Sequence, residues 1–215
     1  MKSVLVIGLG RFGRYVAEKM IELNHEVMAI DNVEEHVNKV LPWVTNAQIG
    51  DCTDEEFLRS LGVRNFDLCI VAIGDDFQSS LEVTSLLKEL GAKMVVSRAS
   101  RPIHEKFLLR NGADEVVFPE RQLANWTAIR YSSDQIMNYV ELGTDYAIYE
   151  LELPSSWVGK TLETLDIRKK YNLNILGIRN NGRMEMNVSP STVFQEYMTI
   201  LVLGNKKDVK KYFHL

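Results

Sequence analysis

The sequence has no long apolar stretch, only two cysteines and no excess of basic residues. Its longest uncharged run, 40–50, has 11 residues, whereas a membrane-spanning helix needs about 20 consecutive apolar residues. Cys52 and Cys69 form no CxxC pair and lack metal-ligand spacing, which is typical of a reducing compartment. The N-terminus has no signal-peptide pattern. We therefore expect a cytoplasmic protein without a membrane span.

The charge balance narrows the class of protein further. The net charge is −4, which argues against nucleic-acid binding because nucleic-acid-binding domains usually carry a basic surface. A length of 215 residues suggests one large or two modest domains. Residues 1–148 carry a net charge of −7 and residues 149–215 a net charge of +3. This difference favours two parts with different surfaces.

Short apolar runs alternate with helical patterns over the first 120 residues. The runs are continuously apolar, as strands covered on both faces are. Alternation of strands and helices requires parallel pairing through crossovers, so the sequence predicts a Rossmann-like, doubly wound α/β sheet. The predicted strands are 4–7, 27–30, 47–49, 68–72, 94–97 and 116–118.

The rest of the chain predicts a connector and a small α+β domain. Residues 121–146 contain no glycine or proline before Gly143 and predict one or two helices with an apolar face for a partner subunit. Asn180-Asn181-Gly182 is a hairpin signal, because Asn and Gly tolerate positive φ. The predicted domains are 1–120, 121–146 and 147–215, and the last contains strands at 147–153, 175–178, 184–188 and 200–203 and helices at 161–170 and 206–214.

A glycine-rich turn follows the first predicted strand. Gly8, Gly10 and Gly13 form a GxGxxG motif that opens a helix, and Asp31 ends the second strand. Such glycines let a phosphate approach the backbone, and the helix N-terminus attracts the anion. A carboxylate at Asp31 accepts hydrogen bonds from ribose hydroxyls and repels a 2′-phosphate, which disfavours NADP. The pattern predicts nucleotide binding; the alternative is that the glycines serve packing alone.

Arg11 lies inside this loop. Its guanidinium is placed to contact a further phosphate oxygen, and the alternative is a solvated arginine at a helix start. Other polar residues follow later strands, where ligands bind in open α/β sheets: Asp51, Gly74, Asp75, Asp76, Ser97, Arg98 and Glu120.

Three of these positions carry a more specific interpretation. Asp75 and Asp76 also fit caps of the helix that begins at Phe77. Glu120 near a triphosphate would be repelled unless a cation, divalent or sodium, bridged the two, so Glu120 is the candidate metal ligand.

No catalytic set accompanies the glycine loop. The Tyr-x-x-x-Lys spacing at Tyr15 and Lys19 falls on the first helix beside the loop, where a chance match is the better interpretation. None of the four histidines belongs to a nucleophile or metalloprotease motif. His104 starts the fifth helix near the cleft and is a candidate ligand contact. A nucleotide sensor is therefore favoured over an enzyme, with an NAD-dependent oxidoreductase as the alternative.

Several of these segments together resemble a known family. They are the GLGRFG loop, Asp31, Gly50-Asp51, the run 72–80 and Phe118-Pro119-Glu120. The full chain is similar to KtrA-type regulatory subunits of Ktr potassium uptake systems, which are regulator-of-potassium-conductance (RCK, or KTN) proteins. The resemblance implies an RCK N-terminal domain, a crossover helix and an RCK C-terminal (TrkA-C) domain.

The resemblance also implies ligands and partners. It implies a homo-oligomer in which dimers assemble into an octameric ring. The ring would bind a KtrB-type membrane potassium-translocating subunit and would therefore be peripheral to the membrane. ATP and ADP would compete for the N-domain cleft, with NAD or NADH as the alternative ligand. The nucleotide residues implied are Gly8, Gly10, Arg11, Phe12, Gly13, Asp31, Asn32, Asp51, Cys52, Ile73, Gly74, Asp75, Arg98, His104 and Glu120. A cyclic di-AMP site in the C-domain would use Asp166, Ile167, Arg168, Asn174, Ile175 and Pro190.

Overall fold

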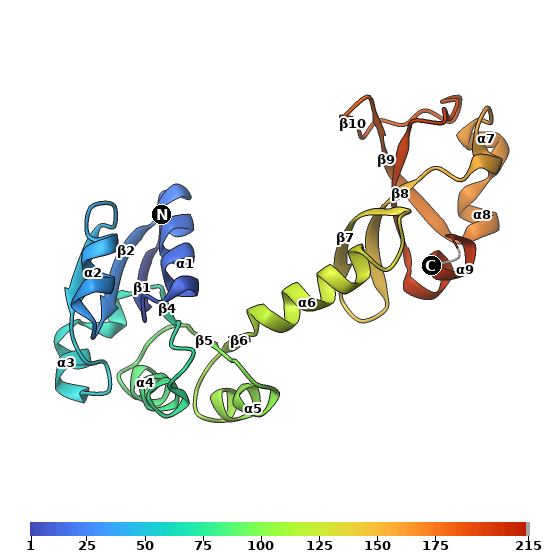
Figure 1. Ribbon diagram of the computed structural model, residues 1–215. Helices are drawn as coiled ribbons and strands as arrows, with labels where there is room; N and C mark the ends of the chain where they lie inside the picture. The colour runs from blue at the N-terminus through green and yellow to red at the C-terminus, as the bar shows by residue number, and fades with distance from the viewer. Residues whose placement is uncertain (214–215) are drawn as a thin grey trace. The chain divides into compact units, whose positions relative to one another are not determined.

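The computed structural model describes residues 1–213. Contacts between residues divide the chain into two units, Met1–Arg121 and Gln122–Leu215, which are called the first and second unit below (Figure 1). Among the described residues, no helix combines the length and the apolar character needed to cross a membrane.

The first unit is built on a six-stranded parallel sheet with the order β3-β2-β1-β4-β5-β6. β1 (Ser3–Ile7) is buried along almost its full length, because helices cover both faces of the sheet. Rossmann-like folds share this order, in which the direction of strand addition reverses between β1 and β4. The other strands are β2 (Glu26–Asp31), β3 (Asn46–Ile49), β4 (Leu68–Val71), β5 (Val95–Arg98) and β6 (Glu115–Val117).

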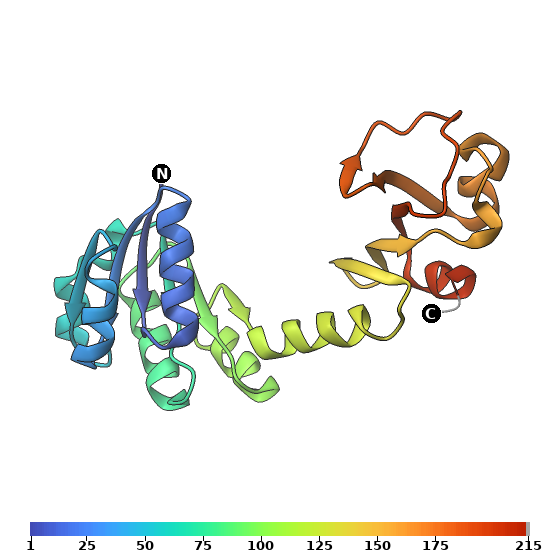
Figure 2. The ribbon, with the colours of Figure 1, turned by 45° about the horizontal axis from the view of Figure 1, so that its top comes forward.

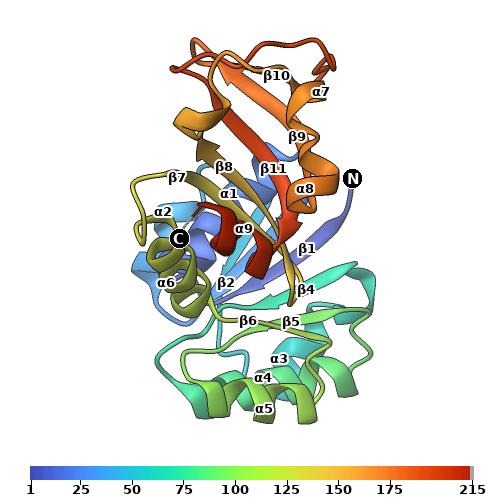
Figure 3. The ribbon, with the colours of Figure 1, turned by 90° about the vertical axis from the view of Figure 1, so that its right-hand side faces the viewer.

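The helices of the first unit separate into two groups. α1 (Arg11–Glu22) and α2 (Glu34–Val40) pack on one face through Ala17, Val37 and Val40, and Figure 2 shows α1 lying along the strands. Figure 3 shows the second group together below the sheet: α3 (Glu55–Ser60), α4 (Phe77–Glu89) and α5 (Pro102–Arg110), with the 3-10 turn Val63–Asn65 after α3.

The predicted architecture of this unit is confirmed. All six predicted strands are present, in parallel register, with helices between them. Gly91 and Gly112, at the ends of α4 and α5, have φ values of 87° and 110°. Glycine adopts this left-handed backbone conformation without steric strain, and helices therefore often end at a glycine.

The second unit is a five-stranded antiparallel sheet with the order β10-β9-β11-β8-β7. One face packs against short helices through a core that includes Trp157, Leu165, Phe194 and Phe213. The elements are α6 (Pro119–Arg130, continuing from the first unit), β7 (Ile136–Leu142), β8 (Tyr146–Glu152), the 3-10 turn Ser155–Trp157, α7 (Leu162–Leu165), α8 (Ile167–Tyr171), β9 (Leu173–Asn180), β10 (Arg183–Glu185), β11 (Thr199–Asn205) and α9 (Lys206–Phe213).

One prediction for the connector is wrong. The segment Ile136–Leu142 was expected to be helical, but it is β7, which pairs with β8 in the second unit. The pairing register shifts between Ile136 and Asn138, so Met137 is an extra residue in the strand. A bulge of this kind interrupts the two-residue alternation that would otherwise mark a strand.

Other predictions for the second unit hold with changes of boundary. Asn181 and Gly182 have φ values of 48° and 80° and form the turn between β9 and β10, as the hairpin signal predicted. The predicted helix 161–170 is divided into α7 and α8 at Asp166, whose φ is 46°. The predicted last helix ends at Phe213, and His214 and Leu215 lie outside the described residues.

Candidate functional site

A cavity of about 710 Å³ opens at the carboxyl ends of β1, β2 and β4. This is the edge of a doubly wound sheet where ligands bind, and the volume lies in the range of small-molecule sites, about 300–1,000 Å³. The cavity brings together most of the residues predicted from the sequence: Gly8, Gly10, Arg11, Phe12, Asp31, Asn32, Asp51, Cys52, Ile73, Gly74, Asp75, Arg98 and Glu120.

The three loop glycines have different roles. A Cβ at Gly13 would lie 1.9 Å from the carbonyl oxygen of Gly8, so Gly13 permits close helix–strand packing and does not line the cavity. Gly8 has a φ of 92° and lies against the backbone of Ile73. A Cβ at Gly10 would meet nothing within 4 Å. The backbone at Gly10 is therefore the part of the loop that is open to a ligand.

The N-terminus of α1 is built to receive an anion. Gly10 is the N-cap and provides no side-chain acceptor, and the first turn contains no acidic residue. The first N–H groups of a helix have no partner within the helix and carry a partial positive charge. Arg11 is the first residue of α1 and lines the same cavity. A phosphate group fits this end of the cavity.

Asp31 fixes the loop from the end of β2. One of its oxygens, Oδ2, accepts a hydrogen bond of 2.6 Å from the Leu9 N–H, and the other, Oδ1, accepts one of 2.8 Å from the Val33 N–H. The side chain is only 9% exposed. The carboxylate thus holds the glycine loop as well as lining the cavity, a structural role that the sequence pattern did not reveal.

Arg98 and Glu120 form an ion pair on the cavity wall. Gly74 makes room for it, because a Cβ at Gly74 would lie 2.2 Å from a guanidinium nitrogen of Arg98. The guanidinium carbon also lies 5.6 Å from the centroid of the Phe12 ring. The Nε atom of Arg98 is buried without a hydrogen-bond partner among the described residues, so part of this cation's bonding capacity is unused.

Glu120 does not fit a cation site as the protein stands. Burial raises the pKa of Glu120, but hydrogen bonds from its own backbone N–H and from Arg98, with the charges of Arg98 and Arg11, outweigh burial and hold that pKa below its usual value. The ionised carboxylate already has an arginine as its counter-ion. Within residues 1–213, no group of three or more His, Cys, Asp or Glu residues is arranged to hold a metal ion. A cation would have to displace Arg98 and take its other ligands from elsewhere.

The other acidic residues near the cavity shape turns. Oδ1 of Asp51 accepts hydrogen bonds from the N–H and hydroxyl of Thr53, at 2.9 and 2.7 Å. Of the two predicted caps, Asp76 is the N-cap of α4 and accepts a hydrogen bond of 3.1 Å from the Ser79 N–H. Asp75 is not the N-cap and lines the cavity. Burial raises the pKa of the Cys52 thiol to about 12, so this cysteine is a protonated wall residue at neutral pH.

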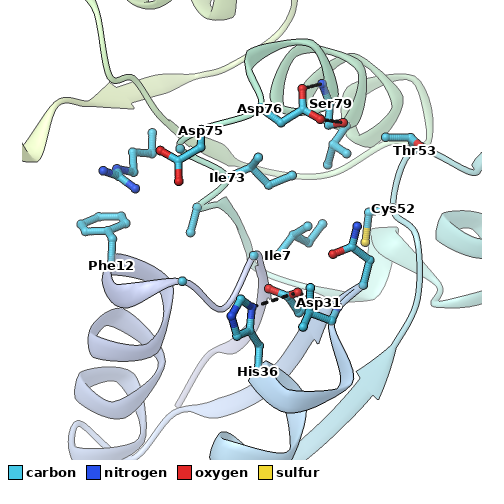
Figure 4. Close-up of a pocket in the computed structure, with 18 of the residues that line it drawn as sticks. Ile7, Phe12, Asp31, His36, Cys52, Thr53, Ile73, Asp75, Asp76 and Ser79 are labelled. Carbon is cyan, nitrogen blue, oxygen red and sulfur yellow. Dashed lines mark hydrogen bonds and ion pairs between the residues drawn. The ribbon is translucent and has the colours of Figure 1, made fainter.

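Two histidines differ from expectation. His104 does not line the cavity; its ring stacks on Phe77 with centroids 3.8 Å apart, and its Nδ1 lies 3.1 Å from the Ser100 hydroxyl. The reason is its position on the inner face of α5, where it is 9% exposed. His36, which no motif had indicated, does line the cavity and reaches Asp31 from the first turn of α2 (Figure 4).

The residues predicted for a second ligand lie around α7 and α8. Asp166, Ile167 and Arg168 lie where α7 ends and α8 begins, and β9, which contains Asn174 and Ile175, contacts α8. The Pro190 carbonyl accepts a hydrogen bond of 3.0 Å from the Glu163 N–H of α7.

The side chain of Ile167 is 3% exposed and packs in the core. It is therefore closed to a ligand in this structure. A cavity of about 360 Å³ in the second unit is lined by other residues: Gln135, Glu152, Leu153, Pro154, Ser155, Tyr212 and Phe213.

The solved structures with a similar fold include the GsuK RCK domain and the GsuK channel. The crystal structure of the GsuK RCK domain has a TM-score of 0.69 and is 20% identical, covering 97% of this chain and 46% of its own. The GsuK channel bound to NAD has a TM-score of 0.71 at 20% identity, covering 100% of this chain and 39% of its own. This chain therefore spans less than half of those chains, and the likeness establishes the fold.

Sequence comparisons identify the family. The TrkA-N domain matches residues 4–119 and the TrkA-C domain residues 146–215. Ktr system potassium uptake protein C of Bacillus subtilis (strain 168) is 38% identical, covering 98% of this chain and 96% of its own, and protein A of the same organism is 36% identical, covering 98% and 95%. The chain belongs to the family of TrkA-N and TrkA-C domain proteins that includes the Ktr potassium uptake proteins A and C.

Proposed function

We propose that this protein is a cytoplasmic, non-enzymatic regulatory subunit that controls potassium uptake by a separate membrane protein of the KtrB type, in response to ATP and ADP bound in the first unit. The names of its relatives support a role in potassium uptake. The site geometry supports an adenine nucleotide as the signal. Purification of the full chain from membranes that contain a KtrB-type protein tests the partner, and failure of the two to copurify would contradict it.

The observation that carries the nucleotide proposal is the position of Arg11 beside an uncapped helix N-terminus. Arg11 lines the cavity as the first residue of α1, next to the open backbone of Gly10. ATP brings one more phosphate than ADP, and a ligand shifts a conformational equilibrium only by binding one state more tightly than another. A contact between Arg11 and the terminal phosphate would provide that difference.

Calorimetric titration of Arg11→Ala with ATP and with ADP tests this contact. A charge-assisted hydrogen bond contributes about 1.5–3 kcal/mol, so we expect ATP affinity to fall by about 10-fold or more and ADP affinity to fall less. Arg110→Ala is the matched control, because it removes the same charge from the exposed end of α5. An unchanged ratio of ATP to ADP affinity in Arg11→Ala would rule out the role of Arg11.

We also propose that the protein forms dimers that assemble into an octameric ring. α6 supports it: none of the residues of α6 is buried, and Leu123 is 64% and Trp126 37% exposed. Apolar side chains exposed along a helix commonly mark a subunit interface. Light scattering of the full chain tests the assembly, with Leu123→Glu expected to reduce the particle mass and Lys106→Glu, on the exposed surface of α5, expected to leave it unchanged. A monomeric wild-type protein would contradict the ring.

Cyclic di-AMP is proposed as the ligand of the second unit. The last turn of α8 carries Arg168, Lys169 and Lys170, which suits an anionic ligand. We expect Arg168→Ala to weaken binding of cyclic di-AMP to the full chain about 10-fold, and Lys211→Ala on α9 to leave it unchanged. Absence of binding to the wild-type chain at micromolar ligand would count against this site.

An NAD-dependent oxidoreductase is the alternative function, because the glycine loop and Asp31 also suit NAD. Turnover assayed by nicotinamide absorbance with a panel of substrates separates the two functions. Tight NADH binding in preference to ATP, with turnover, would favour the enzyme.

A further inference from the structure

His36 and Asp31 form a pair at the end of β2 that the sequence motifs did not indicate. The Nδ1 atom of His36 lies 3.2 Å from Oδ1 of Asp31, and both residues line the cavity. The histidine side chain is 34% exposed, whereas the carboxylate is 9% exposed. Figure 4 shows His36 directed from α2 toward Asp31. The accessible member of the pair is thus the histidine.

Asp31 has much of its bonding capacity committed to the protein. Each of its oxygens accepts a backbone hydrogen bond, from Leu9 at 2.6 Å and from Val33 at 2.8 Å. An ionised carboxylate has about four acceptor positions, and Nδ1 of His36 lies beside Oδ1. Few directions remain from which Asp31 can accept a ligand hydroxyl, so recognition of a diol needs a second acceptor.

The contact with Asp31 determines which nitrogen of His36 carries a proton. A lone pair on Nδ1 would face the lone pairs of a carboxylate oxygen, so we assign the proton to Nδ1. The remaining nitrogen, Nε2, is then a hydrogen-bond acceptor in the neutral ring. Within residues 1–213, no side-chain or backbone group forms a hydrogen bond with Nε2.

The ring is also incompletely satisfied on its inner side. Nδ1 is buried, yet its contact with Asp31 lacks the alignment of a hydrogen bond, and no other described atom is its partner. Polar atoms buried without a partner are rare, because each loses its hydrogen bonds to water without replacing them. A ligand that draws His36 into alignment would remove this cost.

We infer that His36 and Asp31 together recognise the ribose diol of the bound nucleotide, with one hydroxyl donating to Nε2 of His36 and the other to Asp31. This inference rests on the proposed function and adds a specificity-determining residue to its site. It makes the protein selective for ribonucleotides over deoxyribonucleotides through a side chain of α2.

The test compares ADP with 2′-deoxy-ADP and 3′-deoxy-ADP by calorimetry on the full chain. One neutral hydrogen bond is worth about 0.5–1.5 kcal/mol, so we expect the wild-type protein to bind the more affected deoxy analogue about 3–10-fold more weakly than ADP. In His36→Leu this penalty should fall to about twofold or less. His36→Gln, which retains an acceptor oxygen, should restore most of it.

His25→Leu is the matched control, because His25 lies in the turn before β2 and its side chain, among the described residues, accepts a hydrogen bond only from the Lys2 N–H. It should retain the wild-type penalty. A deoxy penalty in His36→Leu equal to that of the wild type would overturn the inference and leave nucleotide sensing intact. If His36→Leu binds no ADP, His36→Gln decides: binding with the penalty supports the inference, and binding without it contradicts the inference. A folded wild-type protein that binds neither ADP nor ATP would contradict the proposed function itself.

Discussion

The cores of the two units are packed in different ways. In the first unit, aliphatic clusters lie on both faces of a parallel sheet, and glycines bring the backbone close enough to form a cavity at the strand ends. In the second unit, one cluster rich in aromatic rings covers one face of an antiparallel sheet, with Trp157 near three other rings at centroid distances of 5.2–6.2 Å. The cavity of the first unit thus depends on glycines, which have no side chain, and the core of the second unit depends on large aromatic side chains.

The largest effect is expected from removing a large ring from the second unit. Phe194 is fully buried, and its ring centroid lies 6.2 Å from that of Trp157. Phe194→Ala leaves a cavity and should lower the free energy of unfolding of this unit by about 4 kcal/mol. The measurement is urea unfolding followed by Trp157 fluorescence in a chain with Trp43 and Trp126 replaced by Phe.

The same substitution should leave the first unit unchanged, as followed by Trp43 in the complementary single-tryptophan chain. Tyr197→Ala is the control in the same segment, since Tyr197 is 58% exposed and surface substitutions change stability by about 0.5 kcal/mol or less. Equal loss of stability in both units would mean that they unfold together and that their cores are not independent.

Adding a single methyl group should be nearly as damaging in the first unit. The new Cβ of Gly13→Ala would lie 1.9 Å from the Gly8 carbonyl oxygen and 3.1 Å from the Cβ of Ala72, so the backbone of Gly8 would have to move. We expect the free energy of unfolding of the first unit to fall by about 3 kcal/mol. Urea unfolding monitored through Trp43 measures it.

Gly10→Ala separates packing from ligand binding. Its Cβ would meet nothing within 4 Å, so the loss of stability should be limited to the poorer N-cap preference of alanine, about 1 kcal/mol, while ADP affinity falls because the methyl group enters the open end of the loop. For Gly13→Ala, a free energy of unfolding equal to that of the wild type would show that α1 and β1 move apart readily. That result would contradict the close packing of the glycine loop.

The difference between the units also explains what the sequence could predict. Residues that follow separate strands were expected to lie close together because the carboxyl ends of parallel strands share an edge. Arg11, Asp31 and Arg98 do line one cavity. His36 was missed since its contact with Asp31 depends on how α2 starts, which no periodicity encodes.

In the second unit, antiparallel strands are joined locally and carry no comparable positional rule. Ile136–Leu142 was expected to be a helix because no glycine or proline interrupts the segment before Gly143. The bulge at Met137 disturbs the alternation that would have marked it as a strand. In the first unit, His104 was expected near the cleft from its position at the start of the fifth helix and from the family resemblance, yet it stacks on Phe77 instead. Side-chain direction on a helix near a site is decided by packing, which the sequence alone does not give.

Ligand binding should act on one unit alone. A ligand that binds only the folded state stabilises it by about 2.7 kcal/mol at 100 times its Kd. We expect ADP at that concentration to raise the urea midpoint of the Trp43 transition and to leave that of Trp157 unchanged. Gly10→Ala is the control that should lose this response. An equal shift of both transitions would show that the nucleotide couples the two units.

The smallest effect is expected from an exposed carboxylate of the first unit. Asp67 accepts a hydrogen bond of 2.8 Å from Lys93 and one of 3.0 Å from the Ser3 N–H, and these, with the charge of Lys93, lower its pKa to about 2. A carboxylate whose pKa is lower in the folded protein stabilises the fold above its unfolded pKa and loses that contribution as the pH falls. For Asp67 the loss occurs between about pH 4 and the folded pKa of about 2.

Asp67→Asn should therefore lower the urea midpoint of the Trp43 transition slightly at pH 7 and by less at pH 3, and the Trp157 transition should not respond. The effect is small because Asp67 and Lys93 are 40% and 54% exposed, and solvent screens such a pair. Glu115→Gln, at an exposed carboxylate for which no ion pair is found among the described residues, is the control and should leave the urea midpoint of the Trp43 transition unchanged at pH 7. A difference between Asp67→Asn and wild type that grows on acidification would have the wrong sign for a lowered pKa, and would place the origin of the first unit's acid sensitivity elsewhere.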